Sequence, residues 1–334
     1  MSANGGGRPR VGIFFPSFVW PETHQTEPLD RIDACLERCD RYGFDVWVVD
    51  HLLVAPGLYG ATWLDPMVFL TYAAARTKTA ALGTAILVAP LRQPVLLAKE
   101  IASLQLLSGH RFQLGVGTGW DAKEFEAVGA RLNQRGRRTD ELLESLERLF
   151  GDEVAGYDGK YYAFEDISMV PRVPMPPVWV AGGSRIPDPG EADIPDIAES
   201  VKRRVVKAGR WLSRASGKQE WVKRDWRKLT DYAEANDVDP ATMTFGHCNW
   251  FHFVDADTRE AAIAEQAPHY QKVMGTHRSV EHLSECYLLG TTDDVTERLQ
   301  DLVDAGCSYL CVGPTSADPE QIDFFADHVL PRLS

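Results

Sequence analysis

The sequence predicts a single (β/α)8 TIM barrel, an α/β fold, with insertions in its βα loops. Apolar segments with strand character alternate with helical segments along the chain, and the strand segments are almost continuously apolar. Such strands are typical of a parallel sheet that helices cover on both faces. About eight strand segments occur in the 334 residues, and eight β/α units of ~250 residues in total, plus insertions, match the size of a TIM barrel.

The first half of the chain contains four strand segments, each followed by a helical one. We expect strands at 11–15, 45–50, 80–90 and 111–120, and helices at 28–44, 65–77, 94–109 and 136–150. Asp65 is a suitable N-cap and Pro66 takes the first helical position. The third helix ends at a glycine, which is a common C-terminal signal.

The second half repeats the pattern more loosely. Strands are expected at 176–184, 242–254 and 308–316, and the sixth strand, near 204–211, has the weakest pattern. Two segments do not fit the repeat: 151–173 is turn-rich and 185–235 is polar and helical. We interpret both as insertions in βα loops, where lids and substrate pockets lie. Residues 1–10 are glycine-rich and predict a disordered leader, so the barrel is expected over 11–334.

Charge and composition argue against several classes of partner. The net charge of −13 disfavours nucleic acid and anionic membranes, and no apolar run approaches the ~18 residues of a membrane span. The six cysteines lack a CxxC pair and predict free thiols in a reducing cytosol, hence a cytoplasmic protein. The nine histidines show no metal-binding spacing, so no metal is expected. The candidate anion-binding basic clusters are Arg131, Arg135, Arg137 and Arg138, and Lys202, Arg203, Arg204 and Lys207.

Polar or glycine-rich residues follow five of the predicted strands. Because the carboxyl ends of barrel strands share one mouth, which carries the chemistry, these residues are expected to converge. Asp50 and His51 end the second strand; each alone is compatible with a loop salt bridge or a rim histidine, but the convergence favours a functional site. The stretch 115–120 ends in Trp120 and therefore does not match the G-x-G-x-x-G dinucleotide fingerprint. The stretch 181–184, "AGGS", is either a phosphate-binding turn or an ordinary tight turn.

Long stretches of the chain resemble the bacterial luciferase-like oxidoreductases, a TIM-barrel superfamily that uses FMN or the deazaflavin F420. The resemblance covers most of the first 185 residues and returns near the C-terminus, whereas 185–240 departs from the family. It is carried by "GFDVWVVDHLLVAP", by 81–129 including "GTAILVAP" and "GVGTGW", by "RGRRTDELLESLERL", by "PPVWVAGGS" and by 287–313.

The resemblance implies a role for each matching residue. The pair Asp50-His51 is typical of the F420-using branch, where it lies against the cofactor ring, so F420 is the expected cofactor and FMN the alternative. A bulge with a non-prolyl cis peptide at Ala85–Ile86 would support the ring, and the turn at 181–184 would hold the cofactor phosphate. The expected catalytic residues are His51 and Asp50. The expected cofactor contacts are Asp50, Thr84, Ala85, Ile86, Val88, Gly117, Thr118, Gly119, Ala181, Gly182, Gly183 and Ser184.

The residue after the strand-four glycine bears on the substrate. Sugar-phosphate dehydrogenases of this branch carry a glutamate there, and this chain has Trp120. A sugar phosphate is therefore disfavoured, and an apolar or aromatic substrate is expected to contact Phe15, Trp120 and Trp211.

The expected function is hydride transfer between F420 and a small organic substrate, with His51 as a proton donor or charge stabiliser. One alternative is an FMN-dependent monooxygenase that uses reduced flavin and oxygen. Another is a non-catalytic flavin-binding partner subunit. Members of the family that the chain resembles commonly form homodimers, so a homodimer is expected.

Overall fold

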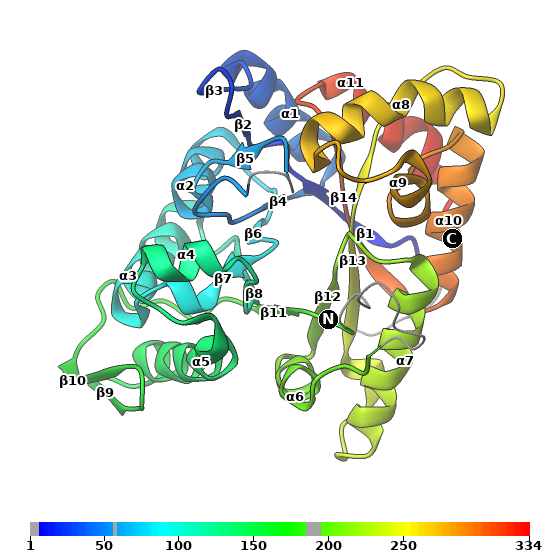
Figure 1. The fold of residues 1–334 in the computed structure, drawn as a ribbon. Helices are drawn as coiled ribbons and strands as arrows, with labels where there is room; N and C mark the ends of the chain where they lie inside the picture. Colours follow the sequence, from blue (N-terminus) through cyan, green and yellow to red (C-terminus); the bar gives the residue numbers. More distant parts are fainter. Residues whose placement is uncertain (1–6, 56–58, 185–194) are drawn as a thin grey trace.

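The computed structural model describes residues 7–55, 59–184 and 195–334, and its central feature is a closed parallel β-barrel (Figure 1). The sheet order is β11-β12-β13-β14-β1-β4-β6-β8, and pairing of β11 with β8 closes it. β7 continues the third barrel position after a break and pairs with β8 as β6 does. The predicted TIM barrel is confirmed. The barrel strands are β1 (Arg10–Phe14), β4 (Asp45–Val48), β6 (Leu82–Thr84), β7 (Leu87–Val88), β8 (Phe112–Gly117), β11 (Val178–Ala181), β12 (Arg210–Ser213), β13 (Thr244–Phe251) and β14 (Cys307–Pro314).

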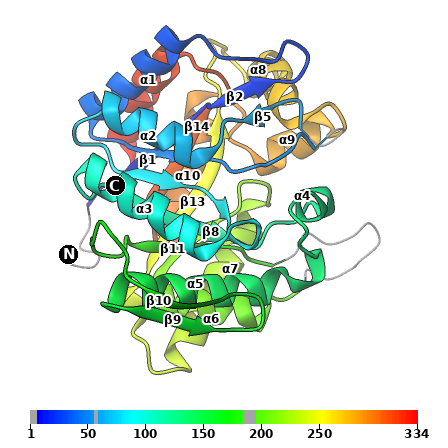
Figure 2. The same ribbon diagram turned by 90° about the vertical axis from the view of Figure 1, so that its left-hand side faces the viewer.

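Helices surround the strands on the outside (Figures 1 and 2). The predicted end signals are confirmed: Asp65 accepts the backbone N–H groups of Met67 and Val68, and Gly109 adopts a left-handed conformation with φ 70°. The helices are α1 (Leu29–Tyr42), α2 (Pro66–Arg76), α3 (Pro94–Ser108), α4 (Ala122–Ala127), α5 (Arg135–Gly151), α6 (Glu199–Ala208), α7 (Gln219–Glu234), α8 (Arg259–Met274), α9 (Val280–Cys286), α10 (Thr292–Asp304) and α11 (Pro319–Phe324).

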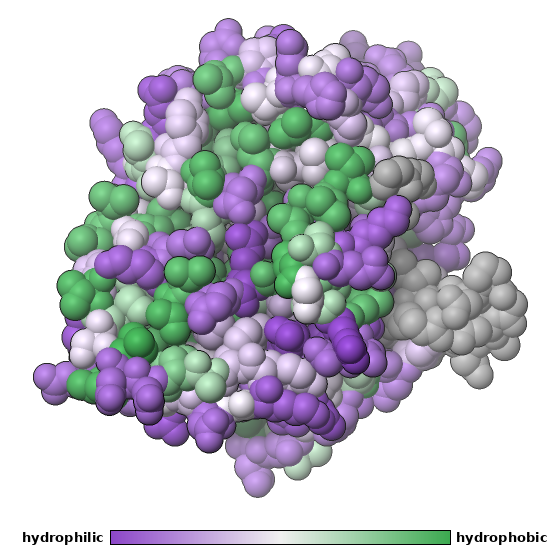
Figure 3. All heavy atoms as spheres, turned by 60° about the vertical axis from the view of Figure 1, so that its left-hand side comes forward, coloured by the Kyte–Doolittle hydropathy of each residue, from purple (hydrophilic) through white to green (hydrophobic). Residues whose placement is uncertain are grey.

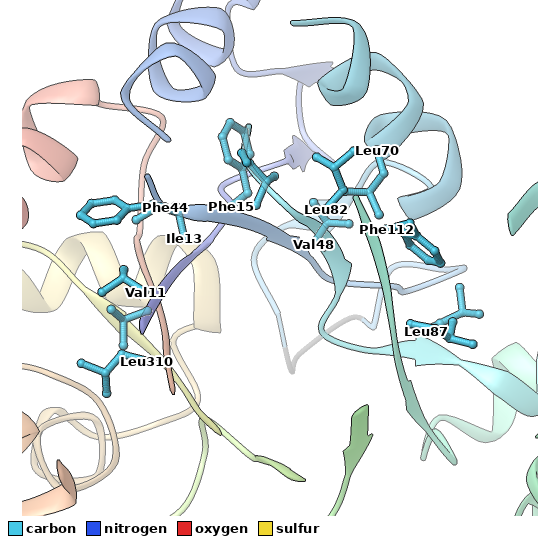
Figure 4. Close-up of a cluster of buried hydrophobic side chains, with 14 of the residues drawn as sticks. Val11, Ile13, Phe15, Phe44, Val48, Leu70, Leu82, Leu87, Phe112 and Leu310 are labelled. Carbon is cyan, nitrogen blue, oxygen red and sulfur yellow. The ribbon is translucent and has the colours of Figure 1, made fainter. Parts of the chain in front are cut away.

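An apolar layer fills the space between strands and helices. Alternate strand residues point outward into it, as the period of a β-strand requires. Figure 4 shows this layer on one side of the barrel, with side chains from β1, β4, β6, β8 and β14 meeting others from the helices and connections. The labelled members are Val11, Ile13, Phe15, Phe44, Val48, Leu70, Leu82, Leu87, Phe112 and Leu310.

The interior of the barrel is filled by side chains. The Trp47 indole Nε1 donates to the Tyr309 hydroxyl at 2.6 Å, and that hydroxyl donates to Asp45 at 2.5 Å. A Cβ atom at Gly12 or Gly83 would lie 2.4 Å from the Trp47 ring, so both glycines provide the room that this ring needs. Because the interior is packed, a ligand has to bind at the mouth formed by the carboxyl ends of the strands.

The weakly predicted sixth strand lies further along the chain than expected. Residues 199–208 form α6, which ends at Gly209 with φ 65°, and the strand β12 follows at 210–213. The described part of 185–235 thus holds α6, β12 and the whole of α7, which are regular barrel units, and our interpretation as an insertion was wrong there. Residues 185–194 lie outside the described part of the chain.

The other predicted insertion, 151–173, has a different position from the one expected. It contains the hairpin of β9 (Ala155–Asp158) and β10 (Ala163–Ile167), which follows α5 and precedes β11. The hairpin therefore belongs to an αβ connection, on the opposite side from the mouth. The longer βα connections carry β2 (Phe18–Trp20) and β3 (Gln25–Thr26) after β1, β5 (Thr62–Trp63) after β4, and α8 and α9 after β13.

Residues 8–10, which we assigned to a disordered leader, belong to the folded barrel. Arg8 donates to the carbonyl of Pro331, Pro9 is buried and Arg10 begins β1. Residues 1–6 lie outside the described part. All six cysteines are buried and unpaired, which confirms the prediction of free thiols. Within the described ranges, no helix is long and apolar enough to cross a membrane, and no group of three potential metal ligands occurs.

Candidate active site

A cavity of about 360 Å³ lies at the mouth of the barrel, where the strand ends converge. Eleven of the residues predicted from the sequence line it: Asp50, His51, Ala85, Ile86, Val88, Gly117, Thr118, Gly119, Trp120, Ala181 and Gly182. The sequence analysis missed its other lining residues: Phe14, Val49, Tyr59, Trp63, Glu124, Arg214, Ala215, Ser216, Trp250, Met274 and Tyr287.

The imidazole of His51 is held by a buried carboxylate. His51 Nδ1 lies 3.1 Å from Glu124 Oε1, and the Glu124 side chain is only 1% exposed. The same oxygen accepts the backbone N–H groups of Leu52 at 2.8 Å and Leu53 at 3.2 Å. An N–H at Nδ1 is the arrangement that satisfies the carboxylate, and it leaves Nε2 for a ligand.

Glu124 was not predicted as a site residue. It lies on the six-residue helix α4, where the sequence suggests an exposed surface, but the helix turns it back toward the residues after β4. Burial acts to raise the pKa of this carboxyl, but the hydrogen bonds from His51 and from the two backbone N–H groups outweigh burial and hold the pKa below its usual value. Glu124 is therefore an ionised anchor for His51 at neutral pH.

Asp50 lines the cavity, but protein groups use both of its carboxylate oxygens. Oδ2 accepts the backbone N–H of Val88 at 2.9 Å, and Oδ1 accepts from the guanidinium of Arg92 at 2.8 Å. Burial raises the pKa of Asp50, and the charge of Arg92 opposes this. The geometry supports a role for Asp50 in positioning β7 and Arg92, rather than the catalytic role that we expected.

The third barrel position provides an apolar shelf. The peptide bond between Ala85 and Ile86 is cis, which confirms that prediction, and both residues line the cavity. A Cβ atom at Gly117 would lie 2.5 Å from Ile86 Cδ1, so Gly117 makes room for that side chain. Thr84 does not reach the cavity: it is fully buried, and its hydroxyl both donates to the carbonyl of Gly115 and accepts its N–H.

The turn at 181–184 contributes only its first half to the cavity. Ala181 and Gly182 line it, whereas Gly183 and Ser184 do not. The backbone N–H and the hydroxyl of Ser184 both donate to Asp225 Oδ2, at 2.7 and 2.9 Å. A Cβ atom at Gly183 would lie 2.6 Å from the same oxygen. The two donors of Ser184, which we expected to help hold a phosphate, are thus engaged by a carboxylate of α7.

Two of the three predicted substrate contacts point away from the cavity. Phe15 is fully buried in the outer apolar layer (Figure 4). Its ring packs on that of Phe69. The indole of Trp211 donates to the carbonyl of Gly182 at 2.7 Å and stacks on Trp226 and Phe245. Both predictions were wrong. Phe14 lines the cavity instead of Phe15, because neighbouring strand residues face opposite ways.

Aromatic rings form much of the cavity wall. The rings of Tyr59 and Trp63 each have their centroid 5.3 Å from that of His51, and the ring of Trp120 lies 5.7 Å away. Trp120 is 47% exposed, so it stands at the opening. The indole Nε1 of Trp63 is buried and has no hydrogen-bond partner in the described part of the chain.

Four of the eight basic residues that we expected to bind an anion form ion pairs elsewhere, and none of the eight lines the cavity. Arg203 and Arg204 contact Asp140, Lys202 contacts Asp196, and Lys207 contacts Glu147. The guanidinium that does line it is Arg214, just after β12. Arg214 Nη1 donates to the carbonyl of Ser184, and Nη2 is buried without a hydrogen-bond partner among the described residues.

Comparison with known proteins identifies the family. The family described as "Luciferase-like monooxygenase" matches residues 10–187, more than half of the chain. The chain therefore belongs to the luciferase-like monooxygenase family.

Relatives of known or unknown activity occur among the similar sequences. The F420-dependent glucose-6-phosphate dehydrogenase of Intrasporangium calvum is 26% identical over 327 residues, covering 92% of this chain and 96% of the relative. The enzyme of the same name from Kineococcus radiotolerans is 32% identical over 152 residues, 44% of each chain. The uncharacterised protein y4vJ of Sinorhizobium fredii is 30% identical over 123 residues, 36% of this chain. The matched region spans 35% of the length of y4vJ and 49% of the length of the uncharacterised protein Mb0965c of Mycobacterium bovis.

Solved structures confirm the fold along almost the whole chain. The monooxygenase RslO1 of Streptomyces bottropensis superposes with a TM-score of 0.78 at 22% identity, covering 96% of this chain and 99% of its own. An F420-dependent secondary alcohol dehydrogenase in complex with an F420-acetone adduct gives 0.74 at 19% identity, covering 98% and 100%. Both F420- and FMN-dependent enzymes thus share this fold.

Proposed function

We propose that the protein is an F420-dependent oxidoreductase that transfers a hydride between the cofactor and a small apolar or aromatic substrate. The observation that carries the proposal is the buried Glu124–His51 pair at an aromatic-walled cavity. A histidine so held can take up and release a proton beside a bound substrate. A relative that matches over nearly the full length, an F420-dependent dehydrogenase, supports F420 over FMN.

The residues of the cavity fit a flat ring cofactor. Ala85, Ile86 and Gly117 offer an apolar surface close to the backbone, and Gly117 could not carry a side chain without displacing Ile86. The unpartnered Nη2 of Arg214 fits the negative charge that F420 and FMN both carry on a phosphate. F420, when bound, supplies a ring carbon that accepts or gives up a hydride.

The protein's own groups would handle the proton and the orientation of the substrate. When an alcohol is oxidised, its hydroxyl loses a proton, and Nε2 of His51 is the group placed to accept it. The Glu124 carboxylate on Nδ1 stabilises the resulting imidazolium and fixes the orientation of the ring. The Trp63 N–H is placed to hold the substrate oxygen, and the rings of Tyr59 and Trp120 exclude water from one side.

Trp120 supports the substrate class. It takes the place where the sugar-phosphate dehydrogenases that the chain resembles have a glutamate, and it stands half-exposed at the opening of the cavity. An indole there offers a large apolar face for an aromatic or aliphatic group and no charge or acceptor for a sugar.

An anaerobic assay with F420 and a panel of alcohols tests the proposal. We expect aromatic and apolar secondary alcohols to bleach the visible absorption of oxidised F420, and glucose 6-phosphate not to do so. Bleaching by glucose 6-phosphate alone would contradict the substrate class. Oxygen uptake with reduced FMN, and no reaction with F420, would establish the FMN monooxygenase instead. Binding of a cofactor with no turnover in either assay would favour the non-catalytic subunit.

A second copy of the chain is the partner that we propose. Helices α2 and α3 carry strongly exposed apolar side chains, among them Val68 at 71% and Leu96 at 66%. Figure 3 shows hydrophobic residues interspersed with hydrophilic ones on the side of the molecule that carries α2 to α5. Light scattering on the purified protein distinguishes a dimer from a monomer, and a monomer at micromolar concentration would contradict the proposal.

A further inference from the structure

An anionic group of the protein itself, the Asp225 carboxylate, already lies at the turn that follows β11. The Asp225 carboxylate on α7 takes both donors of Ser184 and leaves no room for a side chain at Gly183. Its other oxygen accepts from Arg224 at 3.3 Å. Asp225 is 3% exposed, and separating a buried carboxylate from such partners costs free energy. A ligand phosphate would have to displace a buried charge to use the same donors.

Arg214 lies beside this turn and is held in place on several sides. Its Nη1 donates to the carbonyl of Ser184, and its guanidinium carbon lies 6.0 Å from the centre of the Trp221 ring. A Cβ atom at Gly217 would lie 2.8 Å from its Nε, so the chain passes close by. The position of the guanidinium is thus fixed before any ligand binds, which reduces the entropy cost of binding.

The unsatisfied donor of Arg214 favours an anionic ligand. The neighbouring carboxylate, Asp225, accepts from Ser184 and from Arg224. Arg214 keeps a buried Nη2 that no described residue satisfies, and it lines the cavity. A buried charged donor without a partner is costly, and an oxyanion that binds to it removes that cost.

We infer that Arg214 binds the phosphate of the cofactor, and that Asp225 keeps the two donors of Ser184 from it. This inference rests on the proposed function only in taking a phosphate-bearing flavin or deazaflavin as the ligand. A guanidinium suits the task because it presents two parallel N–H donors to a phosphate.

Pairs of chromophores with and without the phosphate test the inference. The probes are FMN against riboflavin, and F420 against its phosphate-free ribityl deazaflavin core, with dissociation constants from fluorescence quenching. The ratio of the two constants in the FMN pair measures the phosphate's contribution and does not depend on turnover, and the ratio in the F420 pair measures the phosphate together with the tail that it carries. The variants are Arg214→Gln, Ser184→Ala and, as a control on the exposed face of α6, Arg203→Gln.

We expect Arg214→Gln to reduce the phosphate preference about 10- to 100-fold, as for the loss of a hydrogen bond between charged groups. Ser184→Ala and Arg203→Gln are expected to leave it within about two-fold. A preference that survives Arg214→Gln overturns the inference, and loss in Ser184→Ala alone would assign the phosphate to the turn.

A second substitution covers the case in which Arg214→Gln does not fold. Arg214→Lys keeps the charge but not the paired donors, and we expect it to retain an intermediate preference; an unchanged preference in this variant also counts against the inference. Wild-type protein that binds all four chromophores weakly would overturn the proposed function and this inference together. Tight wild-type binding with no effect of Arg214 overturns the inference alone.

Discussion

Glu124→Gln is a substitution whose effect on stability can be worked out from the structure. The wild-type carboxylate oxygen accepts three hydrogen bonds, from His51 at 3.1 Å, Leu52 at 2.8 Å and Leu53 at 3.2 Å. A glutamine keeps the shape and an acceptor oxygen but removes the charge. Each charge-assisted bond is stronger than its neutral counterpart by about 1 kcal/mol. The cost of burying the charge offsets part of this sum, so we expect a loss of about 1–2 kcal/mol in the free energy of unfolding at pH 7.

The pH dependence of this loss has a definite sign. The pKa of Glu124 is lowered in the folded protein from its ordinary value near 4.5. A lowered pKa means that the carboxylate stabilises the fold above its unfolded pKa, and that this contribution disappears as the pH falls through the folded pKa. The difference between wild type and Glu124→Gln is therefore expected to be full at pH 7 and to shrink below about pH 4.5.

Urea unfolding at several pH values measures this difference. Glu126→Gln is the matched control, because Glu126 lies on the same helix, two residues further on, and is exposed. The control is expected to unfold at the same urea concentration as the wild type. Equal midpoints for Glu124→Gln and wild type at pH 7, or a difference that stays constant down to pH 4, would refute an ionised Glu124 that anchors His51.

Three further substitutions test the roles of other cavity residues. His51→Ala is expected to lower turnover by a factor of roughly 10²–10⁴ while cofactor binding is retained. Turnover equal to that of the wild type would show that His51 has no catalytic role. Ala85→Phe is expected to abolish cofactor binding while the thermal unfolding midpoint stays close to that of the wild type, because Ala85 lines the cavity. Normal cofactor affinity in a titration would contradict a role for Ala85 and Ile86 in supporting the cofactor ring. Trp120→Ala is expected to raise KM for aromatic substrates more than for small aliphatic ones in steady-state assays, and an equal rise for both would count against ring stacking.

The features of the fold that depend on local rules were predictable from the sequence. Asp65 with Pro66 marks the start of α2, Gly109 marks the end of α3, and the apolar runs mark most barrel strands. Asp50, His51, Gly117, Gly119 and Trp120 converge on one cavity because the strands are parallel, which places all their carboxyl ends together.

The errors concern properties that local patterns do not contain. Phe15 was assigned to the wrong face because a shift of one residue along a strand reverses the direction of every side chain. Residues 199–208 are charged and helical, so the pattern alone did not show that they precede a barrel strand.

Contacts between distant segments were also hidden. Glu124 reaches residues 51–53, and Asp225 reaches Ser184, through contacts more than 40 positions apart in sequence. Neither carboxylate has a distinctive neighbour in the sequence, so only the assembled barrel reveals what each one binds.

The most direct test of the proposed function is a competitive titration of the purified protein with F420 and FMN, followed by the fluorescence of each. We predict that F420 binds more tightly than FMN, and that the protein saturated with F420 and an apolar secondary alcohol bleaches the cofactor without consuming oxygen. Tighter binding of FMN, accompanied by oxygen uptake once the flavin is reduced, would contradict the account and assign the cavity to a monooxygenase.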